Sequence, residues 1–397
     1  MTPYPTSPSV RRMKTIIVGG GIMGLSAAWG LARAGHTVEL FEQGALPNPL
    51  ASSVDEHRLI RHPYGDRTGY ARMIDPAFEA WDLMWRDLGQ TFYAPTGTLA
   101  LTGNGADWAE RSARTLAAIG RPMTELSLDQ LRRRFPQLDA RGVEHAFWMD
   151  TGGVLFAQDI VAALARHLES RPGMTLRPRT PVRSVDLEQG RVVTEAGATH
   201  EPDMVIVAAG AWVGRLLPDL ARTLVPSRQV VIYFRLPEEQ HTVWAKGPMI
   251  IQKTGDVGLY FVPPMQGRGF KIGDHSFSRS GDPDAGREAT EDEIRPLLER
   301  CRGLFKGFDA WRTDRVKACF YTVTEDERFV VEKAGAKGWL MSPCSGHGFK
   351  FGALMGLEHA RTIAANRDPA SHTRWAAGLE SDIHVSPQIP LPARGRG

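Results

Sequence analysis

The first regular pattern along the chain is a short apolar run followed by a helical one. Residues 14–18 (KTIIV) form a β-branched run that is typical of a strand. Apolar residues recur at helical spacing over 22–34, and Gly35 can cap that helix in the left-handed conformation. A second strand-like run covers 37–42. This order predicts two parallel strands joined by a right-handed crossover helix.

The rest of the chain mixes helical and strand-like segments. Helical periodicity predicts helices over 76–88, 128–134, 158–169, 291–304 and 352–365. Ser127 and Gln130 have the spacing of a capping box. Strand-like runs cover 175–178, 182–187, 191–194 and 204–208, and residues 229–275 have a pattern typical of antiparallel strands. The mixture predicts an α/β protein.

Composition indicates a globular protein of two or three domains. Of its 397 residues, 42% are hydrophobic and 23% are charged, so the chain can bury a sizeable core. Its 41 glycines indicate tight turns or close backbone approach to a ligand. Lys plus Arg is 48 and Asp plus Glu is 45, without long runs of one sign. We therefore expect no nucleic-acid partner.

The number of cysteines and the hydropathy of the chain indicate its redox compartment and whether a membrane is a partner. Three cysteines are too few for a disulfide framework and lack zinc-ligand spacing, so we expect a reducing compartment, the cytoplasm, and no metal. No apolar stretch of about 18 residues occurs, so we expect no membrane partner. Residues 1–12 and 382–397 lack core residues, and we expect both segments to be flexible.

A glycine fingerprint lies between the first predicted strand and helix. Gly19, Gly21 and Gly24 form Gly-x-Gly-x-x-Gly, and Glu42 ends the second strand. Gly19 permits the tight turn, Gly21 lets the backbone approach a pyrophosphate, and Gly24 lets helix and strand pack closely. Glu42 can accept hydrogen bonds from a ribose diol and disfavours a 2′-phosphate. The unit predicts a bound dinucleotide, with a structural glycine turn as the alternative. The neighbouring residues expected to contact it are Ile22, Met23 and Gln43.

A later strand favours FAD over NAD. Residues 204–212 (MVIVAAGAW) form an apolar run that ends in a small-residue turn. They resemble the segment that closes over the FAD pyrophosphate in two-domain flavoproteins. A buried central strand with an ordinary turn is the alternative. The further expected FAD contacts are Ser52, Val182, Gly210 and Trp212.

Further segments, taken with the fingerprint, resemble one family. They are residues 58–65 (RLIRHPYG), 269–275 (GFKIGDH), 319–322 (CFYT) and 346–351 (GHGFKF). These strings are similar to the D-amino-acid oxidase superfamily, and within it to the group of monomeric sarcosine oxidases and N-methyltryptophan oxidases. The resemblance covers nearly all of residues 13–380. It departs from the family at His57, where the family often has a threonine.

The resemblance implies how the flavin is held. It implies a thioether between FAD and Cys319, whereas a lone cysteine is more often a small buried residue. The helix that begins near Gly352 presents a partial positive charge suited to an anionic reduced flavin. The remaining cofactor contacts that the resemblance implies are Arg58, Gly346, His347, Gly348, Phe349 and Lys350.

Two basic residues are suited to hold an amino-acid substrate. Arg61 offers a planar fork for a carboxylate and Lys350 adds a point charge, so the pair can fix the substrate carboxylate against the flavin. Arg58 is a further candidate beside the flavin. For Arg58 and Arg61 the alternative is a pair of surface ion pairs.

The remaining candidate catalytic residues surround the substrate side of the ring. Lys271 is suited to stabilise the superoxide that forms when oxygen takes an electron from reduced flavin, and the alternative is a lysine on an exposed strand. His275, Tyr260 and Tyr321 match family positions on the substrate side, and each can equally be a core residue.

These observations predict a two-domain α/β protein in which both domains are discontinuous. A Rossmann-like FAD-binding domain comprises residues 13–93, 153–225 and 325–381. A mixed-sheet α+β substrate domain comprises 94–152 and 226–324, and ligands are expected at the interface.

The predicted reaction is oxidation of the C–N bond of a secondary or N-methyl amino acid by a monomeric enzyme. A hydride passes to flavin N5, and molecular oxygen is reduced to hydrogen peroxide. Two alternatives stay open: a dehydrogenase with another electron acceptor, and a non-catalytic nucleotide-binding protein. Sarcosine, a larger N-methyl amino acid, a cyclic imino acid and a sugar–amine adduct all fit as substrates.

Overall fold

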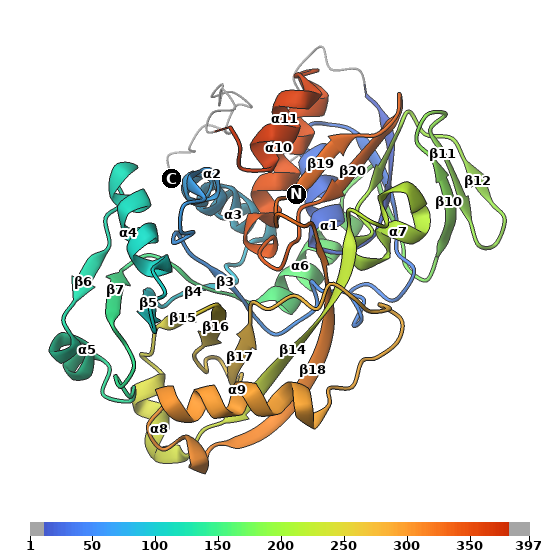
Figure 1. Ribbon diagram of the computed structural model, residues 1–397. Helices are drawn as coiled ribbons and strands as arrows, with labels where there is room; N and C mark the ends of the chain where they lie inside the picture. The colour runs from blue at the N-terminus through green and yellow to red at the C-terminus, as the bar shows by residue number, and fades with distance from the viewer. Residues whose placement is uncertain (1–11, 381–397) are drawn as a thin grey trace.

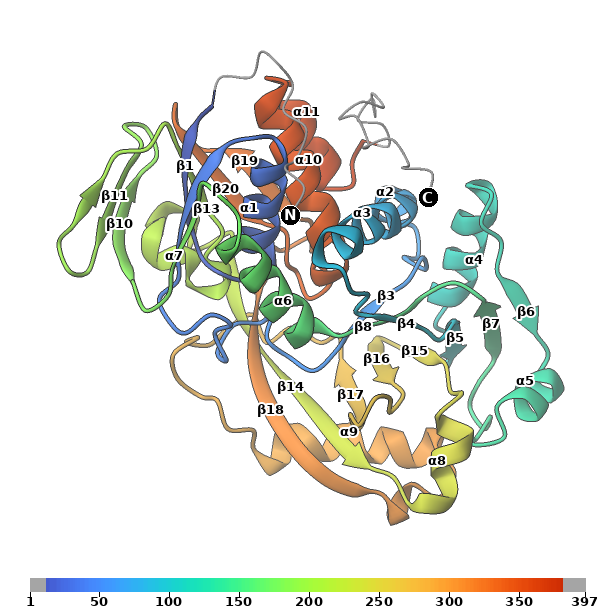
Figure 2. The same cartoon turned by 180° about the vertical axis from the view of Figure 1, so that it is seen from behind.

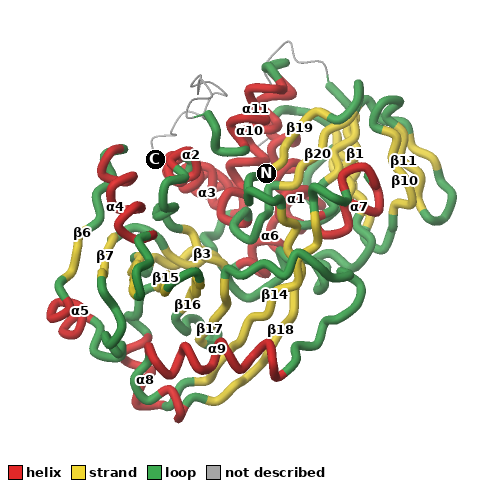
Figure 3. The backbone as a smooth tube through the Cα atoms, in the orientation of Figure 1, coloured by secondary structure: helices red, strands yellow, loops and turns green. Residues whose placement is uncertain are grey.

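The structure is a computed structural model that describes residues 12–380. The two segments predicted to be flexible lie outside the described residues, except for Arg12. Two large sheets, each covered by helices, stack one above the other in the view of Figure 1, and Figure 3 shows the same arrangement by secondary structure. None of the helices within 12–380 has the length and apolar content that a membrane crossing requires.

A six-stranded sheet, ordered β19-β20-β13-β1-β2-β9, forms one half of the molecule. Its strands are β1 (Lys14–Val18), β2 (Thr37–Phe41), β9 (Met174–Arg177), β13 (Met204–Val207), β19 (Val330–Lys333) and β20 (Gly338–Ser342). All neighbours are parallel except β19 and β20. Val18 pairs with both Phe41 and Val207, so β1, β2 and β13 end side by side. The loops that follow these strands therefore meet at one edge.

Helices cover one face of this sheet, as seen from behind in Figure 2. They are α1 (Ile22–Arg33), α3 (Ile74–Leu88), α6 (Ala157–Glu169), α10 (Gly352–Ala364) and α11 (Pro369–Ala376). Helices α1 and α10 cross closely, because a Cβ on Gly30 would overlap the Gly356 carbonyl oxygen. The opposite face packs Ile16 and Val18 against a smaller sheet and a short helix. These are β10 (Val182–Asp186), β11 (Arg191–Thr194), β12 (Thr199–His200) and α7 (Val213–Leu216).

An eight-stranded sheet, ordered β18-β14-β17-β16-β15-β5-β7-β6, forms the other half. Its strands are β5 (Thr98–Gly103), β6 (Thr124–Leu126), β7 (His145–Met149), β14 (Val225–Arg235), β15 (Met249–Thr254), β16 (Val257–Val262), β17 (Phe270–Asp274) and β18 (Arg312–Val323). Only β5 and β15 pair in parallel among these strands. Phe261, Phe270 and Ile272 point to a core that helices cover. The covering helices are α5 (Leu128–Arg134), α8 (Glu238–Trp244) and α9 (Glu291–Leu304).

Side-chain alternation turns the other face of this sheet toward the six-stranded half. Tyr260 and Lys271 are neighbours of Phe261 and Phe270 in sequence, so they point away from the apolar core. A small sheet lies between the two halves in Figure 2. Its strands are β3 (Arg58–Ile60), β4 (Tyr93–Pro95) and β8 (Gly153–Leu155), and α2 (Thr68–Arg72) and α4 (Trp108–Ala118) complete the helices.

Most predicted elements are confirmed within about two residues. The capping box forms, with Gln130 N donating to Ser127 Oγ at 3.2 Å and Ser127 N donating to Gln130 Oε1 at 2.8 Å. Helix α3 begins two residues before Pro76, because a proline in the first turn lacks only an N–H that has no helical partner. The eight-stranded sheet takes its strands from residues 98–149 and 225–323. We keep the predicted two-domain division as a proposal.

Candidate active site

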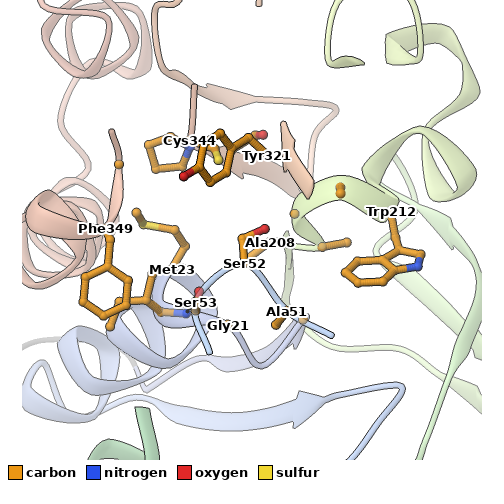
Figure 4. Close-up of a pocket in the computed structure, with 18 of the residues that line it drawn as sticks. Gly21, Met23, Ala51, Ser52, Ser53, Ala208, Trp212, Tyr321, Cys344 and Phe349 are labelled. Carbon is orange, nitrogen blue, oxygen red and sulfur yellow. Dashed lines mark hydrogen bonds between the residues drawn. The ribbon is translucent and has the colours of Figure 1, made fainter. Parts of the chain in front are cut away.

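A cavity of about 360 Å³ lies where the two halves meet. Figure 4 shows Tyr321 and Cys344 across it from Gly21 and Ser53. Most predicted site residues line it: Gly19, Gly21, Ile22, Met23, Glu42, Gln43, Ser52, Arg58, Arg61, Val182, Gly210, Trp212, Tyr260, His275, Tyr321, Gly346, His347, Gly348, Phe349 and Lys350. Gly24, Lys271 and Cys319 stand behind this lining.

The glycine turn between β1 and α1 brings backbone against the cavity. Gly19 has φ +113°, and a Cβ there would overlap the Ala208 carbonyl oxygen. A Cβ on Gly24 would overlap the Gly19 carbonyl oxygen, so the third glycine serves helix–strand packing. Helix α1 begins without a side-chain cap on Gly21, and Ile22 N donates to Ser53 Oγ at 3.0 Å. The positive end of the α1 dipole therefore faces the cavity.

Glu42 braces this turn from the end of β2. Its Oε2 accepts a hydrogen bond from Gly20 N at 2.8 Å. Its Oε1 accepts from Gly44 N at 2.8 Å and from Asn48 Nδ2 at 2.9 Å. The buried carboxylate thus fixes the loop and lies at the cavity edge, where it would accept hydrogen bonds from a ribose diol and repel a 2′-phosphate.

A buried carboxylate, Asp55, holds Lys271 behind the cavity wall. Lys271 Nζ donates to Asp55 Oδ2 at 2.5 Å and to the His57 carbonyl oxygen at 3.1 Å. Arg58 and the Tyr233 hydroxyl donate to the same carboxylate. Burial, and then Arg58, hold the pKa of Lys271 well below its usual value. Because Lys271 is fully buried, the exposed-strand alternative is wrong.

Arg61 and Lys350 meet around Tyr64 and have no acidic partner within residues 12–380. Lys350 Nζ donates to the Tyr64 hydroxyl at 2.9 Å and to the His347 carbonyl oxygen at 2.8 Å. The Arg61 guanidinium lies 4.9 Å from the Tyr64 ring centre and donates to the Pro63 carbonyl oxygen. Burial, and then Arg61, hold the pKa of Lys350 well below its usual value. The surface ion-pair alternative is therefore wrong for Arg61, and also for Arg58, which pairs with buried Asp55.

Tyr260, Tyr321 and His275 form the wall that belongs to the eight-stranded sheet. Burial raises the pKa of Tyr260 to about 12, and Tyr321 hydrogen-bonds to it. Gly273 leaves room for Tyr260, because a Cβ there would overlap its hydroxyl. His275 Nε2 lies 3.4 Å from Glu327 Oε2, and burial lowers the pKa of His275 despite this carboxylate. The wall is therefore aromatic and uncharged at neutral pH.

The two cysteines near the cavity differ in their surroundings. Cys319, on β18, is buried and lies within electrostatic reach of Arg58, Lys271, Arg287 and Lys317. Cys344 lines the cavity, and burial raises the pKa of its thiol. All three cysteines of the chain are free.

Sequence reasoning missed several residues that build the site. Asp55 carried no signal beyond its place in a polar loop. Tyr64 belongs to the family string 58–65 but was not predicted as a site residue, and Tyr233 lies in a strand pattern with no further signal. Ser53 was adjacent to the predicted Ser52, whose hydroxyl donates instead to the Phe320 carbonyl oxygen. His57, the departure from the family pattern, is fully buried, and its ring lies 5.9 Å from that of Tyr233 rather than on the cavity lining.

Residues 14–362 match the family described as FAD dependent oxidoreductase. The chain belongs to this family. The residues described above fit its cofactor, because the glycine turn, the uncapped start of α1 and Glu42 provide the close backbone, dipole and acceptor that a dinucleotide needs. The protein is therefore an FAD-dependent oxidoreductase, and the predicted resemblance is confirmed.

Similar proteins support the same fold along most of the chain. A monomeric sarcosine oxidase of Bacillus sp. (strain NS-129) is 29% identical over 353 residues, which covers 86% of this chain and 90% of that protein. An N-methyl-L-tryptophan oxidase of Yersinia pestis (strain Pestoides F) is 25% identical over 352 residues, covering 86% and 92%. The crystal structure of L-proline dehydrogenase from P. horikoshii matches with a TM-score of 0.78 at 19% identity, covering 94% and 98%. The predicted α/β fold class is confirmed.

Proposed function

We propose that the enzyme oxidises the C–N bond of a secondary or N-methyl amino acid and passes the electrons to oxygen. The observation that carries this proposal is the pair of cations, Arg61 and Lys350, that face the cavity without an acidic partner in the described chain. Buried cations are stable only when a counter-charge or hydrogen bonds compensate them. A substrate carboxylate supplies that counter-charge. The relatives named for sarcosine and N-methyl-L-tryptophan support an N-methyl amino acid.

FAD would be held by the glycine turn, the start of α1, Glu42 and the 346–350 loop. Bound FAD would supply a two-electron acceptor for a hydride from the substrate carbon, and oxygen would then take up the two electrons to give hydrogen peroxide. The chain's own residues orient the substrate. Arg61 and Lys350 bind the carboxylate, while Tyr260 and Tyr321 exclude water from the reacting bond.

We also propose roles for His275 and Lys271, which come from the eight-stranded half of the molecule. The low pKa of His275 keeps its imidazole neutral at pH 7, so it adds no charge beside a substrate amine. Lys271 supplies positive charge where superoxide forms, and Asp55 holds the ammonium in place. We also propose covalent attachment of FAD through Cys319, which no disulfide engages, and a cytoplasmic location. The relative named monomeric sarcosine oxidase supports a monomeric state.

A dehydrogenase is the second candidate, and one observation favours it. Lys271 stands behind the cavity lining and shares its charge with Asp55, which weakens its attraction for an anion formed in the cavity. The structural similarity to an L-proline dehydrogenase is compatible with this candidate. Hydrogen peroxide yield per substrate under air separates the two, because a dehydrogenase leaves most electrons on another acceptor.

Anaerobic mixing of the holoenzyme with candidate amines tests the proposal. Sarcosine, N-methyl amino acids, proline, pipecolate and a sugar–amine adduct are compared by bleaching of the flavin absorbance. Arg61→Ala should lower kcat/KM at least ~30-fold, because it leaves the substrate carboxylate without its charged partner. Amino-acid amides turned over as fast as the acids would disprove the carboxylate role. Flavin that no amine bleaches would favour a non-catalytic nucleotide-binding protein.

A further inference from the structure

Lys253 lies on the cavity side of the eight-stranded sheet, just beyond the predicted substrate wall. On β15 and β16, Ile251 pairs with Tyr260, and both line the cavity. Lys253 pairs with Gly258 two residues further along, and side chains two apart in a strand point to the same face. The Lys253 Cε and Nζ atoms both lie 2.8 Å from the place where a Cβ on residue 258 would stand. The ammonium therefore rests over Gly258, next to Tyr260.

The ammonium of Lys253 is partly buried and forms no hydrogen bond or ion pair with residues 12–380. Burial lowers the pKa of Lys253, and Arg61 is the next cause, so the two cations are close enough to repel each other. The nearby carboxylate of Glu327 is already engaged, with Arg67 at 3.1 Å and His275 at 3.4 Å. Glu327 attracts the Lys253 ammonium less than Arg61 repels it, so this end of the cavity keeps an excess of positive charge.

Arg61 and Lys350 line the cavity with Tyr260, and Lys253 lies on the same face of the sheet, one pair of strand positions beyond Ile251 and Tyr260. None of the three cations has an acidic partner among residues 12–380. One substrate carboxylate between Arg61 and Lys350 leaves Lys253 uncompensated. We propose that Lys253 forms a second anion subsite, which selects amino-acid substrates with a second carboxylate on the side chain. This inference rests on the proposed function, because it takes the first carboxylate as bound by Arg61 and Lys350.

The direct test is binding of unreactive ligands to the holoenzyme by calorimetry. Glutarate carries two carboxylates, and its monoamide, glutaramate, has the same shape with one carboxylate. Glutarate should bind at least about tenfold more tightly, because charge-assisted contacts are stronger than neutral ones. Added salt should reduce this difference, because mobile ions screen partly exposed charges.

Variants then assign the preference to one residue. Lys253→Met should remove the difference between glutarate and glutaramate, whereas Lys253→Arg should retain most of it. Lys333→Met is the matched control, because it removes the same charge from an exposed site on β19. Turnover should follow binding, with kcat/KM for N-methyl-L-glutamate about tenfold above that for N-methyl-L-glutamine in the wild type and equal in Lys253→Met.

The outcomes separate this inference from the proposed function. If both ligands bind equally and Lys253→Met changes neither, the second subsite is wrong while the first carboxylate site stands. If neither ligand binds and no N-methyl amino acid bleaches the flavin, the proposed function itself fails. If Lys253→Met lowers affinity for both ligands equally, Lys253 acts on the first carboxylate and the inference is overturned. If Lys253→Met does not fold, the test is the ratio of glutarate to glutaramate affinity in Lys253→Arg compared with that in the wild type.

Discussion

Single residues around the cavity are distinguished by their neighbours more than by their type. Cys344 lines the cavity and burial raises the pKa of its thiol, whereas Cys319 stands behind the lining and has Arg58, Lys271, Arg287 and Lys317 around it. Lys271 and Lys350 are both buried, but only Lys271 has a carboxylate partner. Position in the fold therefore assigns different chemistry to the same side chain.

Replacement of each cysteine tests how the flavin is attached. We expect the wild-type protein to keep its yellow colour after acid precipitation and to exceed its sequence mass by one FAD. Cys319→Ser should release the flavin, whereas Cys344→Ser, the matched control on the cavity lining, should retain it. The measurement is intact mass with flavin absorbance of the pellet. Release from Cys344→Ser alone would assign the bond to the other cysteine.

Lys271→Met tests the oxygen half-reaction. Loss of one preorganised charge should slow reoxidation of reduced enzyme by about 10²-fold, with a smaller effect on anaerobic reduction by substrate. Stopped-flow traces of the two half-reactions measure this. Equal reoxidation in variant and wild type would remove Lys271 from the mechanism and favour the dehydrogenase.

Asp55→Asn tests whether the Asp55 carboxylate keeps the Lys271 ammonium protonated. Without its carboxylate, burial and Arg58 lower the pKa of Lys271 further, so the ammonium loses its proton at a lower pH. Reoxidation by Asp55→Asn should therefore decline with rising pH earlier than in the wild type. A pH profile identical to that of the wild type would show that Asp55 does not position the charge.

At the level of elements, helix α1 packs closely against the β1–α1 turn in the six-stranded half. Gly24→Ala should destabilise the protein by about 1–3 kcal/mol and weaken FAD retention, because the new methyl group overlaps the Gly19 carbonyl oxygen. Gly303→Ala on α9 is the matched control, because a Cβ there meets nothing within 4 Å. It should be neutral or stabilising by up to about 1 kcal/mol. Chemical denaturation of both variants provides the comparison.

A buried histidine pair between α10 and α11 predicts acid sensitivity. His359 Nδ1 lies 3.3 Å from His372 Nε2, burial lowers the pKa of His372 to about 4, and that of His359 falls well below its usual value. Because the folded state binds protons less readily than the unfolded state, stability is complete above the unfolded pKa near 6.5 and falls as pH decreases toward 4.

The loss attributable to His372 should reach about 2–3 kcal/mol between pH 7 and 4. Denaturation curves at both pH values measure it. His372→Gln should reduce the pH dependence. A wild-type stability that is flat over this range would contradict the assignment.

At the scale of the whole molecule, the cavity joins the two halves. Its lining includes residues of the β1–α1 turn and of the eight-stranded sheet, so a ligand that fills the cavity would contact both halves. We expect the holoenzyme to unfold in one calorimetric transition, and removal of FAD, or the Cys319→Ser variant after dialysis, to lower the Tm. Two separate transitions in the holoenzyme would show that the halves unfold independently.

The sequence predicted features that depend on local spacing. The β1–α1–β2 unit, the glycine fingerprint and the capping box at Ser127 were all predicted from residues fewer than 30 apart. Their signals are local because turns, caps and helix packing require particular residue types at fixed intervals. The parallel pairing of β5 with β15 carried no such signal, since it joins strands about 150 residues apart.

Only the tertiary structure decided which charges are compensated. Nothing in the order of residues indicated that Asp55 would hold Lys271, 216 positions later. The order also did not indicate that Arg61 and Lys350 would share Tyr64 and find no carboxylate among residues 12–380. The sequence determined that a dinucleotide turn and several suitable cations were present. Their pairing depends on which strands and loops meet at the cavity, because electrostatic energy follows distance and burial rather than sequence separation.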